Sequence, residues 1–416
     1  MANFILFLSI IGWLLIFVAV RSYRAKPLVI FQFVIGWWVI ELAFFHMLLN
    51  IAIILMAVGD LGHWTFNTIL GFALSAYNAF QCWVIHTQAT QSKTLFEQGF
   101  SKLTAQNSQY PSIAHRLQLA YQGISENQWL KPFSYHANFS KAHKNIPYGD
   151  DKRQRLTIYE PAEPCDTPMP IMLQIHGGGW TLGYSERQAL PLRDKLTQAG
   201  WLFIAIDYRL SPEAKFPDHL VDCKKALLWI QENIEDYGGD PDFILTTGGS
   251  AGAHLASLLA LTHDQEKQLL QPDFTDKTLP SIKGCVPLYG VYDFLDESGL
   301  RDRVPMKPFL EKTVMQTPPE DPLWELASPI KQLKQDRPPF MVIHGELDTL
   351  AFVEEARAFV QQASASSESP CYYFELPQTQ HAFDLWYSPH AIATIQAIHY
   401  FCEHLYTQYI HDQITD

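Results

Sequence analysis

The chain has 416 residues, of which 48% are hydrophobic and 18% charged, and its formal net charge is −13 at pH 7. A pI near 5.6 with diffuse basic residues argues against nucleic-acid binding, because that function requires a basic face. The sequence holds no Cys-x-x-Cys, no histidine and cysteine ligand cluster and no Gly-x-x-x-x-Gly-Lys, so we expect no metal and no nucleotide cofactor. Six scattered cysteines fit free thiols in a reducing compartment better than a disulfide framework.

The first part of the chain, residues 1–90, is predicted to form membrane-spanning helices. Phe4–Val20 is uncharged and long enough to cross a bilayer at about 1.5 Å rise per residue. It has no basic n-region, so we interpret it as a retained span rather than a signal peptide. Leu28–Val58 is too long for one upright helix and too short for two, which predicts a tilted span or a span plus a re-entrant piece. Thr65–His86 is a milder candidate for a third span.

Charged residues in this region bear on topology and on a polar site. Arg21, with two further basic residues before position 27, places the first short loop in the cytoplasm by the positive-inside tendency. We expect the hydrolase domain in the cytoplasm, with Thr65–His86 as a third span that brings the chain back. If that stretch lies on the membrane surface instead, the domain faces the other side. Glu41 and His46 either mark an intramembrane polar site or are single polar groups that a packed helix tolerates.

Residues 91–145 show a mixed helical pattern, which predicts a helical linker or cap between the membrane part and the segment 146–416. That last segment alternates apolar strand-like runs with helical periods, the pattern of a mostly parallel sheet covered on both faces. It is long enough to bury a core as one domain. Two excursions rich in charge and proline, Asp264–Leu279 and Asp296–Ala327, are either surface loops or pass over the site.

A Gly248-x-Ser250-x-Gly252 motif stands between the apolar strand Phe243–Leu245 and a helical stretch from Ala251 to Leu261. A tight strand-to-helix turn of this kind requires small residues two before and two after the serine, because larger side chains would collide. The motif alone is weak, since it occurs by chance in many chains. Ser250 is therefore a candidate nucleophile that needs support from the rest of the sequence.

The support comes from a glycine-rich loop and from chain order. The strand Ile171–Ile175 leads into His176-Gly-Gly-Gly-Trp180, in which backbone N–H groups can face a developing oxyanion without a Cβ in the way. Hydrolases of this architecture place nucleophile, acid and base in the order Ser, Asp or Glu, His. Asp348 follows the strand Pro339–Ile343 and His381 follows the strand Tyr372–Leu376, so both leave the carboxyl edge of the predicted sheet.

Alternatives to these assignments exist in the sequence. Glu346 is a rival acid, and three histidines near the C-terminal helical stretch are weaker candidates for the base: His390, His399 and His404. His254 follows the elbow along its helix and is interpreted as a packing residue. Trp180, which ends the glycine loop, is a candidate for the substrate pocket.

A known family shares the Gly-x-Ser-x-Gly turn, the His-Gly-Gly-Gly-Trp loop, the segments around Asp348 and His381, and the stretches Asp207-Tyr-Arg-Leu-Ser-Pro-Glu213 and Phe216-Pro217. With these motifs, roughly residues 145–410 resemble the hormone-sensitive-lipase-like branch of the α/β-hydrolase esterases. The resemblance implies oxyanion donors at the N–H groups of Gly178, Gly179 and Ala251. It also implies that a segment before the hydrolase core caps the site. One departure is Gly249, because many relatives carry Asp or Glu there and this chain lacks that carboxylate beneath the elbow.

The predicted fold is an α/β-hydrolase, a mostly parallel central sheet flanked by helices, preceded by a transmembrane helical region. The predicted function is a membrane-anchored serine carboxylic ester hydrolase that acts through an acyl-enzyme on a small ester or lipid-like substrate. Two other functions stay open: an amidase or deacetylase acting on a membrane-borne metabolite, and a non-catalytic interaction protein on a hydrolase scaffold. The sequence says nothing of the oligomeric state.

Overall fold

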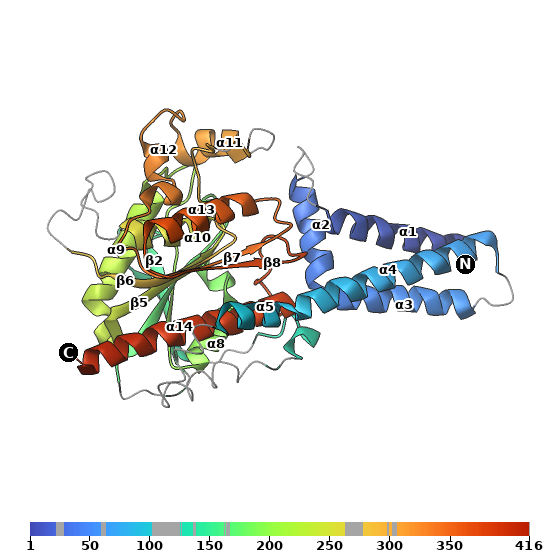
Figure 1. Ribbon diagram of the computed structural model, residues 1–416, viewed down its shortest axis with the longest axis horizontal. Coiled ribbons are helices and arrows are strands. Elements are labelled where there is room, and N and C mark those ends of the chain that lie inside the picture. The colour runs from blue at the N-terminus through green and yellow to red at the C-terminus, as the bar shows by residue number, and fades with distance from the viewer. Residues whose placement is uncertain are drawn as a thin grey trace.

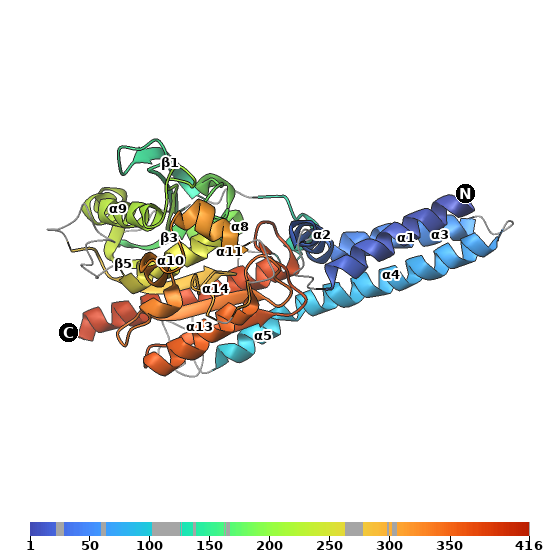
Figure 2. The same ribbon diagram turned by 90° about the horizontal axis from the view of Figure 1, so that it is seen from above.

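The computed structural model describes residues 1–21, 29–59, 64–101, 125, 127–135, 139–161, 163, 167–262, 278–297, 299–301 and 306–415. Within this part of the chain, apolar helices form a rod at one end and an α/β domain forms a wider body at the other (Figure 1). Figure 2 shows the same division from above, with the N-terminus at the far tip of the rod and the C-terminus at the opposite end of the molecule.

An eight-stranded sheet in the order β1-β2-β4-β3-β5-β6-β7-β8 forms the centre of the α/β domain. All neighbours in the part β4-β3-β5-β6-β7-β8 pair in parallel. Strand β2 pairs antiparallel with both β1 and β4. The predicted α/β fold with a mostly parallel sheet is thus confirmed. The strand bounds are β1 Phe139–Pro147, β2 Arg155–Pro161, β3 Met169–Ile175, β4 Leu202–Ile206, β5 Gly239–Gly249, β6 Ile282–Leu288, β7 Phe340–Gly345 and β8 Cys371–Leu376.

Helices cover both faces of the sheet and enclose two apolar cores. One face is covered by α9 (Asp218–Asn233), α10 (Ala251–Thr262) and α13 (Val353–Ser366), the other by α5 (Ser92–Gly99), α8 (Leu190–Gln198) and α14 (Pro389–Thr415) (Figures 1 and 2). The central strands β3, β4 and β7 are buried along their whole length, which explains their continuous apolar runs.

Two features differ from the expected organisation of this domain. The sheet begins with β1, upstream of the expected boundary at residue 146, because β1 is a half-exposed edge strand without an apolar run. The excursion Asp296–Ala327 contains the short helix α11 (Met306–Phe309), a π-helical turn at Leu310–Met315 and α12 (Leu323–Leu326). Residues 263–277, most of the other excursion, lie outside the described residues.

The rod consists of α1 (Ala2–Ala19), α3 (Ala43–Gly59) and α4 (Phe66–Thr90), which pack side by side (Figure 1). Small and polar residues lie where α1 meets α4. The Ser9 hydroxyl is 2.9 Å from the Gly71 carbonyl oxygen and 2.8 Å from the Ser75 hydroxyl, and Asn78 donates to the Ser9 carbonyl at 2.9 Å. Close approach through small residues with hydrogen bonds between helices is typical of helix pairs in membranes.

Among the described residues, two helices are long and apolar enough to cross a membrane, Ala2–Ala19 and the continuous α4–α5 stretch Phe66–Gly99, with mean hydropathies of 2.4 and 1.3. The second apolar run is divided, because α2 (Val29–Glu41) and α3 meet at an angle of 79°. The run is therefore not one straight helix. It has a long helix in the rod, α3, and a separate piece, α2, that turns away from it, as in a broken span or a span with a re-entrant piece.

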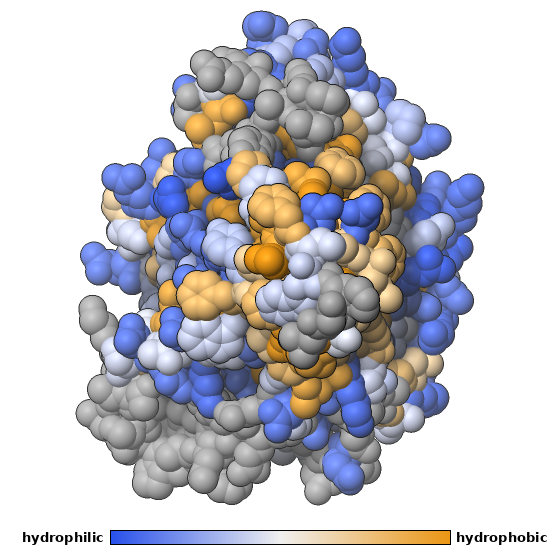
Figure 3. Space-filling model, turned by 90° about the vertical axis from the view of Figure 1, so that its right-hand side faces the viewer, coloured by the Kyte–Doolittle hydropathy of each residue, from blue (hydrophilic) through white to orange (hydrophobic). Residues whose placement is uncertain are grey.

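Helix α2 lies between the rod and the α/β domain, roughly crosswise to the rod (Figures 1 and 2). The α4–α5 stretch continues from the rod along the α/β domain, where Phe96 of α5 contacts Phe374 of β8 with ring centroids 4.7 Å apart. Seen from the tip of the rod, apolar residues gather over the rod and hydrophilic residues over the surrounding domain (Figure 3). The two parts of the chain therefore have surfaces of different chemistry.

Candidate active site

Ser250 lies at the turn between β5 and α10 with a positive φ of 58°. The flanking glycines are required by close packing: a Cβ on Gly248 would lie 2.5 Å from the Ile175 carbonyl oxygen, and one on Gly252 would lie 2.1 Å from the same atom. The Ser250 N–H donates to the Leu288 carbonyl at 3.0 Å. This sharp turn at the carboxyl edge of the sheet has the geometry expected of a nucleophile elbow.

Asp348 and His381 meet at the same edge of the sheet. Asp348 follows β7 and His381 follows β8, and the Oδ2 of Asp348 lies 2.6 Å from the Nδ1 of His381. Glu346, the rival acid, is exposed and accepts the N–H of Gln378 at 2.9 Å. The three other candidate bases lie in α14, and His390 faces Glu41 instead. The geometry therefore favours the pair Asp348 and His381.

The Asp348 carboxylate has three further partners in its buried position. Its Oδ1 accepts the N–H groups of Leu350 at 2.8 Å and Ala351 at 2.9 Å, and its Oδ2 lies 3.3 Å from the Nε2 of His344, which is also 3.0 Å from the Ala351 carbonyl. Burial alone would raise the pKa of Asp348, but the charge of His381 and the bonds from His344 and His381 outweigh it, so the pKa is well below its ordinary value. Asp348 therefore stays ionised beside His381.

The glycine loop after β3 is shaped by backbone that only glycine adopts readily. Gly178 and Gly179 have φ values of 127° and 60°, and a Cβ on Gly178 would lie 2.0 Å from the Leu182 carbonyl oxygen. The side chain of Gln188 holds the loop in place: its Oε1 accepts the Gly177 N–H at 2.7 Å and its Nε2 donates to the Gly177 carbonyl at 3.2 Å. Gln188 was not singled out in the sequence, and no motif marks it.

The Asp207-Tyr208-Arg209 segment braces the same loop from behind. The Tyr208 hydroxyl donates to the His176 carbonyl at 3.0 Å, and Asp207 accepts the N–H of Ser185 at 2.7 Å. Arg209 binds the buried carboxylate of Asp222 through Nε and Nη2 at 2.8 to 3.1 Å. This motif therefore has a clear structural role, which is to fix the loop that would hold the oxyanion.

Trp180 and His254 form a buried pair behind the loop. The Trp180 indole, 2% exposed, donates to the Nδ1 of His254 at 3.3 Å, and the Nε2 of His254 donates to the Ala327 carbonyl at 2.7 Å. Burial lowers the pKa of His254 to about 3, so the ring is neutral and acts in packing. The assignment of Trp180 to the substrate pocket stays a prediction, since its indole faces His254 and Phe294.

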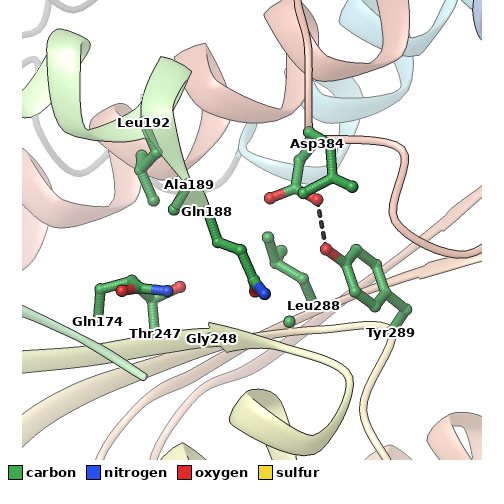
Figure 4. Close-up of a pocket in the computed structure, with 11 residues that line it drawn as sticks. Gln174, Gln188, Ala189, Leu192, Thr247, Gly248, Leu288, Tyr289 and Asp384 are labelled. Carbon is green, nitrogen blue, oxygen red and sulfur yellow. Dashed lines mark hydrogen bonds between the residues drawn. The ribbon is translucent and has the colours of Figure 1, made fainter. Parts of the chain in front are cut away.

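Beneath the elbow lies a small cavity lined by Gln174, Gln188, Thr247 and Leu288 among others (Figure 4). Figure 4 shows Tyr289 and Asp384 pointing toward each other there, and the Tyr289 hydroxyl donates a hydrogen bond to the Asp384 carboxylate. A Cβ on Gly249 would lie 2.5 Å from that hydroxyl oxygen. The Tyr289 ring also contacts the His381 imidazole, with centroids 4.5 Å apart. Tyr289 therefore connects the elbow with the histidine loop.

Helix α2 contacts the loop that carries His381. The Phe33 ring meets the His381 imidazole edge-on, with centroids 5.8 Å apart and planes at 81°. Trp37 donates through Nε1 to the Ala382 carbonyl at 2.9 Å and stacks on Trp386 at 3.9 Å. The sequence did not reveal these contacts, because α2 reads as part of an apolar span.

The two polar residues of that run have separate surroundings. Glu41, at the end of α2, lies with its Oε2 3.2 Å from the Nδ1 of His390 at the start of α14. His46, in α3, lines a cavity between α1 and α3 together with Asn50. The two residues therefore have different partners, and Glu41 joins α2 to the α/β domain.

The expected cap segment is described only in part. Its helix α5 packs along α14 and β8 on the outside of the domain, and residues 102–124 lie outside the described residues. Near its end, Tyr135 donates to the Leu385 carbonyl at 2.8 Å and Phe133 contacts Trp386. Phe309 of α11 comes within 3.7 Å of a Cβ on Gly179, so the excursion Asp296–Ala327 passes over the site.

Comparison with known proteins bears on the fold and on the class of the domain. The BD-FAE family matches residues 156–362. The probable carboxylic ester hydrolase LipM of Mycobacterium tuberculosis is 44% identical over 268 residues, which cover 63% of this chain and 61% of LipM. Esterase LipQ of the same organism is 39% identical over 254 residues, covering 60% of this chain and 59% of LipQ. The chain thus spans about three fifths of the length of the curated relatives it matches.

Among solved structures, esterase B from Lactobacillus rhamnosis is similar with a TM-score of 0.57 and 24% identity, and the match covers 77% of this chain and 99% of that one. This likeness shows the fold. The described part of the chain therefore contains an α/β-hydrolase domain. The relatives LipM and LipQ are named as a probable carboxylic ester hydrolase and an esterase, which supports the resemblance seen in the sequence.

Proposed function

We propose that the chain is a membrane-anchored serine carboxylic ester hydrolase with Ser250 as nucleophile, His381 as base and Asp348 as the acid that orients it. The observation that carries the proposal is the 2.6 Å contact between Asp348 and His381 at the sheet edge where Ser250 occupies its elbow. The relatives LipM and LipQ, named as a probable carboxylic ester hydrolase and an esterase, support the reaction class.

The reaction follows from the arrangement of these groups. Ser250 Oγ attacks the acyl carbonyl while the Nε2 of His381 takes its proton, and Asp348 stabilises the imidazolium through Nδ1–H. The N–H groups of Gly178, Gly179 and Ala251 hold the oxyanion. The alcohol leaves with the proton from His381, and water then attacks the acyl-enzyme, activated by the same histidine, to release the acid and restore Ser250.

The membrane part of the proposal rests on the rod of apolar helices. Large apolar side chains on its surface are exposed in the described structure, among them Phe4 at 53%, Phe7 at 58% and Leu55 at 64%. A continuous exposed apolar surface of this size in water would favour aggregation, whereas in a bilayer it matches the solvent. We place the α/β-hydrolase domain in the cytoplasm, on the side of Arg21.

The test uses the full chain in detergent. We expect the native protein to hydrolyse p-nitrophenyl butyrate and to react covalently with a fluorophosphonate probe, and Ser250→Ala to do neither. The control is Ser364→Ala, the same change at an exposed serine of α13, which should behave like the native protein. Turnover and labelling by Ser250→Ala would refute the nucleophile assignment. Absence of turnover in the native protein with every ester tried would favour the non-catalytic alternative.

A further inference from the structure

Helix α2 presents two apolar faces to two different surroundings. Its inner face touches the loops that carry Asp348 and His381: Val29 packs with Phe352 and Leu350, Phe33 meets His381, and Gly36 lies against Gln380. These positions recur with helical spacing, so they form one stripe. A Cβ on Gly36 would lie 2.9 Å from the Gln380 side chain, which shows how closely the helix approaches this loop.

The outer face of α2 is exposed and entirely apolar. Its exposed side chains are Ile30 at 67%, Phe31 at 60%, Val34 at 49% and Trp38 at 47%. The face continues the apolar surface of the rod, because α2 is joined to α3 at Leu42 and lies at the rod's inner end (Figure 1). If the rod stands across a bilayer, the 79° bend lays α2 along the membrane surface. The occupant that fits this outer face is the bilayer.

The side chains around the glycine loop are apolar as well. Phe309 lies 3.7 Å from a Cβ built on Gly179, and Leu182, 64% exposed, lies beside Gly178. Val29 of α2 and Phe352 form a buried cluster, and Met306, from the same short helix as Phe309, packs against that cluster, so α2 and the excursion over the site contribute to one apolar group. Apolar groups from three parts of the chain therefore surround the candidate reaction centre, which favours a hydrocarbon ligand over a polar one.

We propose that α2 forms one wall of the substrate site through Phe33, and that the substrates are esters with a long hydrocarbon chain that reach Ser250 from the bilayer along α2. This inference rests on the proposed function, and it adds the class of substrate and the path of entry. A helix is about 10 Å across, so one helix thickness separates the bilayer surface from His381. A long chain can then stay partly in lipid while its ester group reacts.

The first test measures chain-length preference with the full protein in detergent. The substrates are p-nitrophenyl esters from acetate to palmitate. We expect Phe33→Ala to lower the ratio of kcat/KM for decanoate to that for acetate by about tenfold, the scale of lost apolar contacts in a pocket. Phe7→Ala, the same change on the exposed surface of α1, should leave the ratio unchanged. If Phe33→Ala misfolds, as seen by loss of fluorophosphonate labelling, Phe33→Leu should give a smaller shift in the same direction.

The second test concerns entry from the membrane. The protein is reconstituted in phosphatidylcholine vesicles that contain p-nitrophenyl palmitate. The short ester, p-nitrophenyl acetate, is supplied in the surrounding water. We expect Phe31→Asp to reduce palmitate turnover about tenfold or more, because a charge on the outer face of α2 resists contact with lipid. The ratio of palmitate to acetate turnover is the readout.

The outcomes separate this inference from the proposed function. Suppose that the native protein cleaves p-nitrophenyl acetate and that Phe33→Ala and Phe33→Leu leave the chain-length preference unchanged. This result would refute the role of α2 as a wall of the substrate site, while the esterase activity would stand. Equal palmitate turnover by Phe31→Asp and the native protein refutes entry along α2. A native protein that cleaves none of the esters refutes the proposed function, and this inference with it.

Discussion

The Tyr289 hydroxyl donates its hydrogen bond to the Asp384 carboxylate in the space directly beneath Gly249, where a side chain would collide with it. The space beneath Gly249 is thus occupied by this pair, whose carboxylate comes from the loop after His381. Burial raises the pKa of Asp384, and the bond from Tyr289 works against that shift. A buried carboxylate therefore lies beside the residue before the nucleophile although that residue is glycine.

We expect Tyr289→Phe to lower kcat by about tenfold with little change in KM, because the buried carboxylate loses its donor and the support of His381 loosens. The pH profile of kcat should shift as well, which a purely structural loss of stability would not cause. Asp384→Asn keeps an acceptor for the hydroxyl and should retain most of the rate. A native pH profile and rate in Tyr289→Phe would show that Tyr289 is not a positioning residue.

A second prediction separates the two acidic residues after β7. Asp348→Asn should reduce kcat by about 10⁴-fold, because the amide favours the wrong tautomer of His381. Glu346→Gln should cost little, since Glu346 is exposed and its partner is the Gln378 N–H. Both variants are compared in the p-nitrophenyl butyrate assay. The reverse ranking would exchange the roles of the two residues.

A third prediction concerns the glycine loop. Gln188→Leu removes both side-chain bonds to Gly177 at nearly constant volume. Because the loop's donors serve the transition state, kcat should fall more than KM rises, by about 10²-fold, the effect of losing one oxyanion donor. Gly178→Ala should be at least as severe, since its Cβ would collide with the Leu182 carbonyl. A change confined to KM would identify the loop as a binding element instead.

Much of this site could be predicted from the sequence because its signals are local. A tight turn selects Gly248 and Gly252, and a strand that ends in His-Gly-Gly-Gly is visible without any tertiary contact. Tyr289, Asp384 and Gln188 carry no such signal, since their roles depend on which side chains the sheet brings together. For the same reason the sequence did not predict that α2 contacts the His381 loop. An apolar run fits burial in lipid and burial against protein equally well, and only the bend at Leu42 brings α2 to the α/β domain.

A fourth prediction follows from the buried histidine behind the glycine loop. His254 has a pKa of about 3 in the folded chain, against about 6.5 when unfolded. Between these values the unfolded chain binds more protons, so stability falls as the pH falls. At pH 5 the loss from this one group is about 2 kcal/mol. The drop in thermal-unfolding midpoint between pH 7.5 and pH 5 should be smaller in His254→Gln than in the native protein.

The control for this measurement is His411→Gln, which changes a half-exposed histidine near the end of α14. It should show the same drop as the native protein. An equal drop in His254→Gln would mean that His254 does not take up a proton on unfolding in this pH range.

The last prediction is the topology of the rod. The N-terminus lies at the far end of the rod, and α1 runs from there toward Arg21 and the α/β-hydrolase domain (Figure 1). Helix α3 ends and α4 begins at the far end too, so crossings by α1, α3 and α4 would put Arg21 and the hydrolase domain on one side. The basic residues Arg21, Arg24 and Lys26 then favour the cytoplasm for that side. Reporters active on one side only, fused after Gly62 and after Asp416, should give opposite signals, with the first outside. External signals from both reporters would refute the cytoplasmic assignment. Replacing all three basic residues with glutamate should weaken the preference for this orientation if these charges set it.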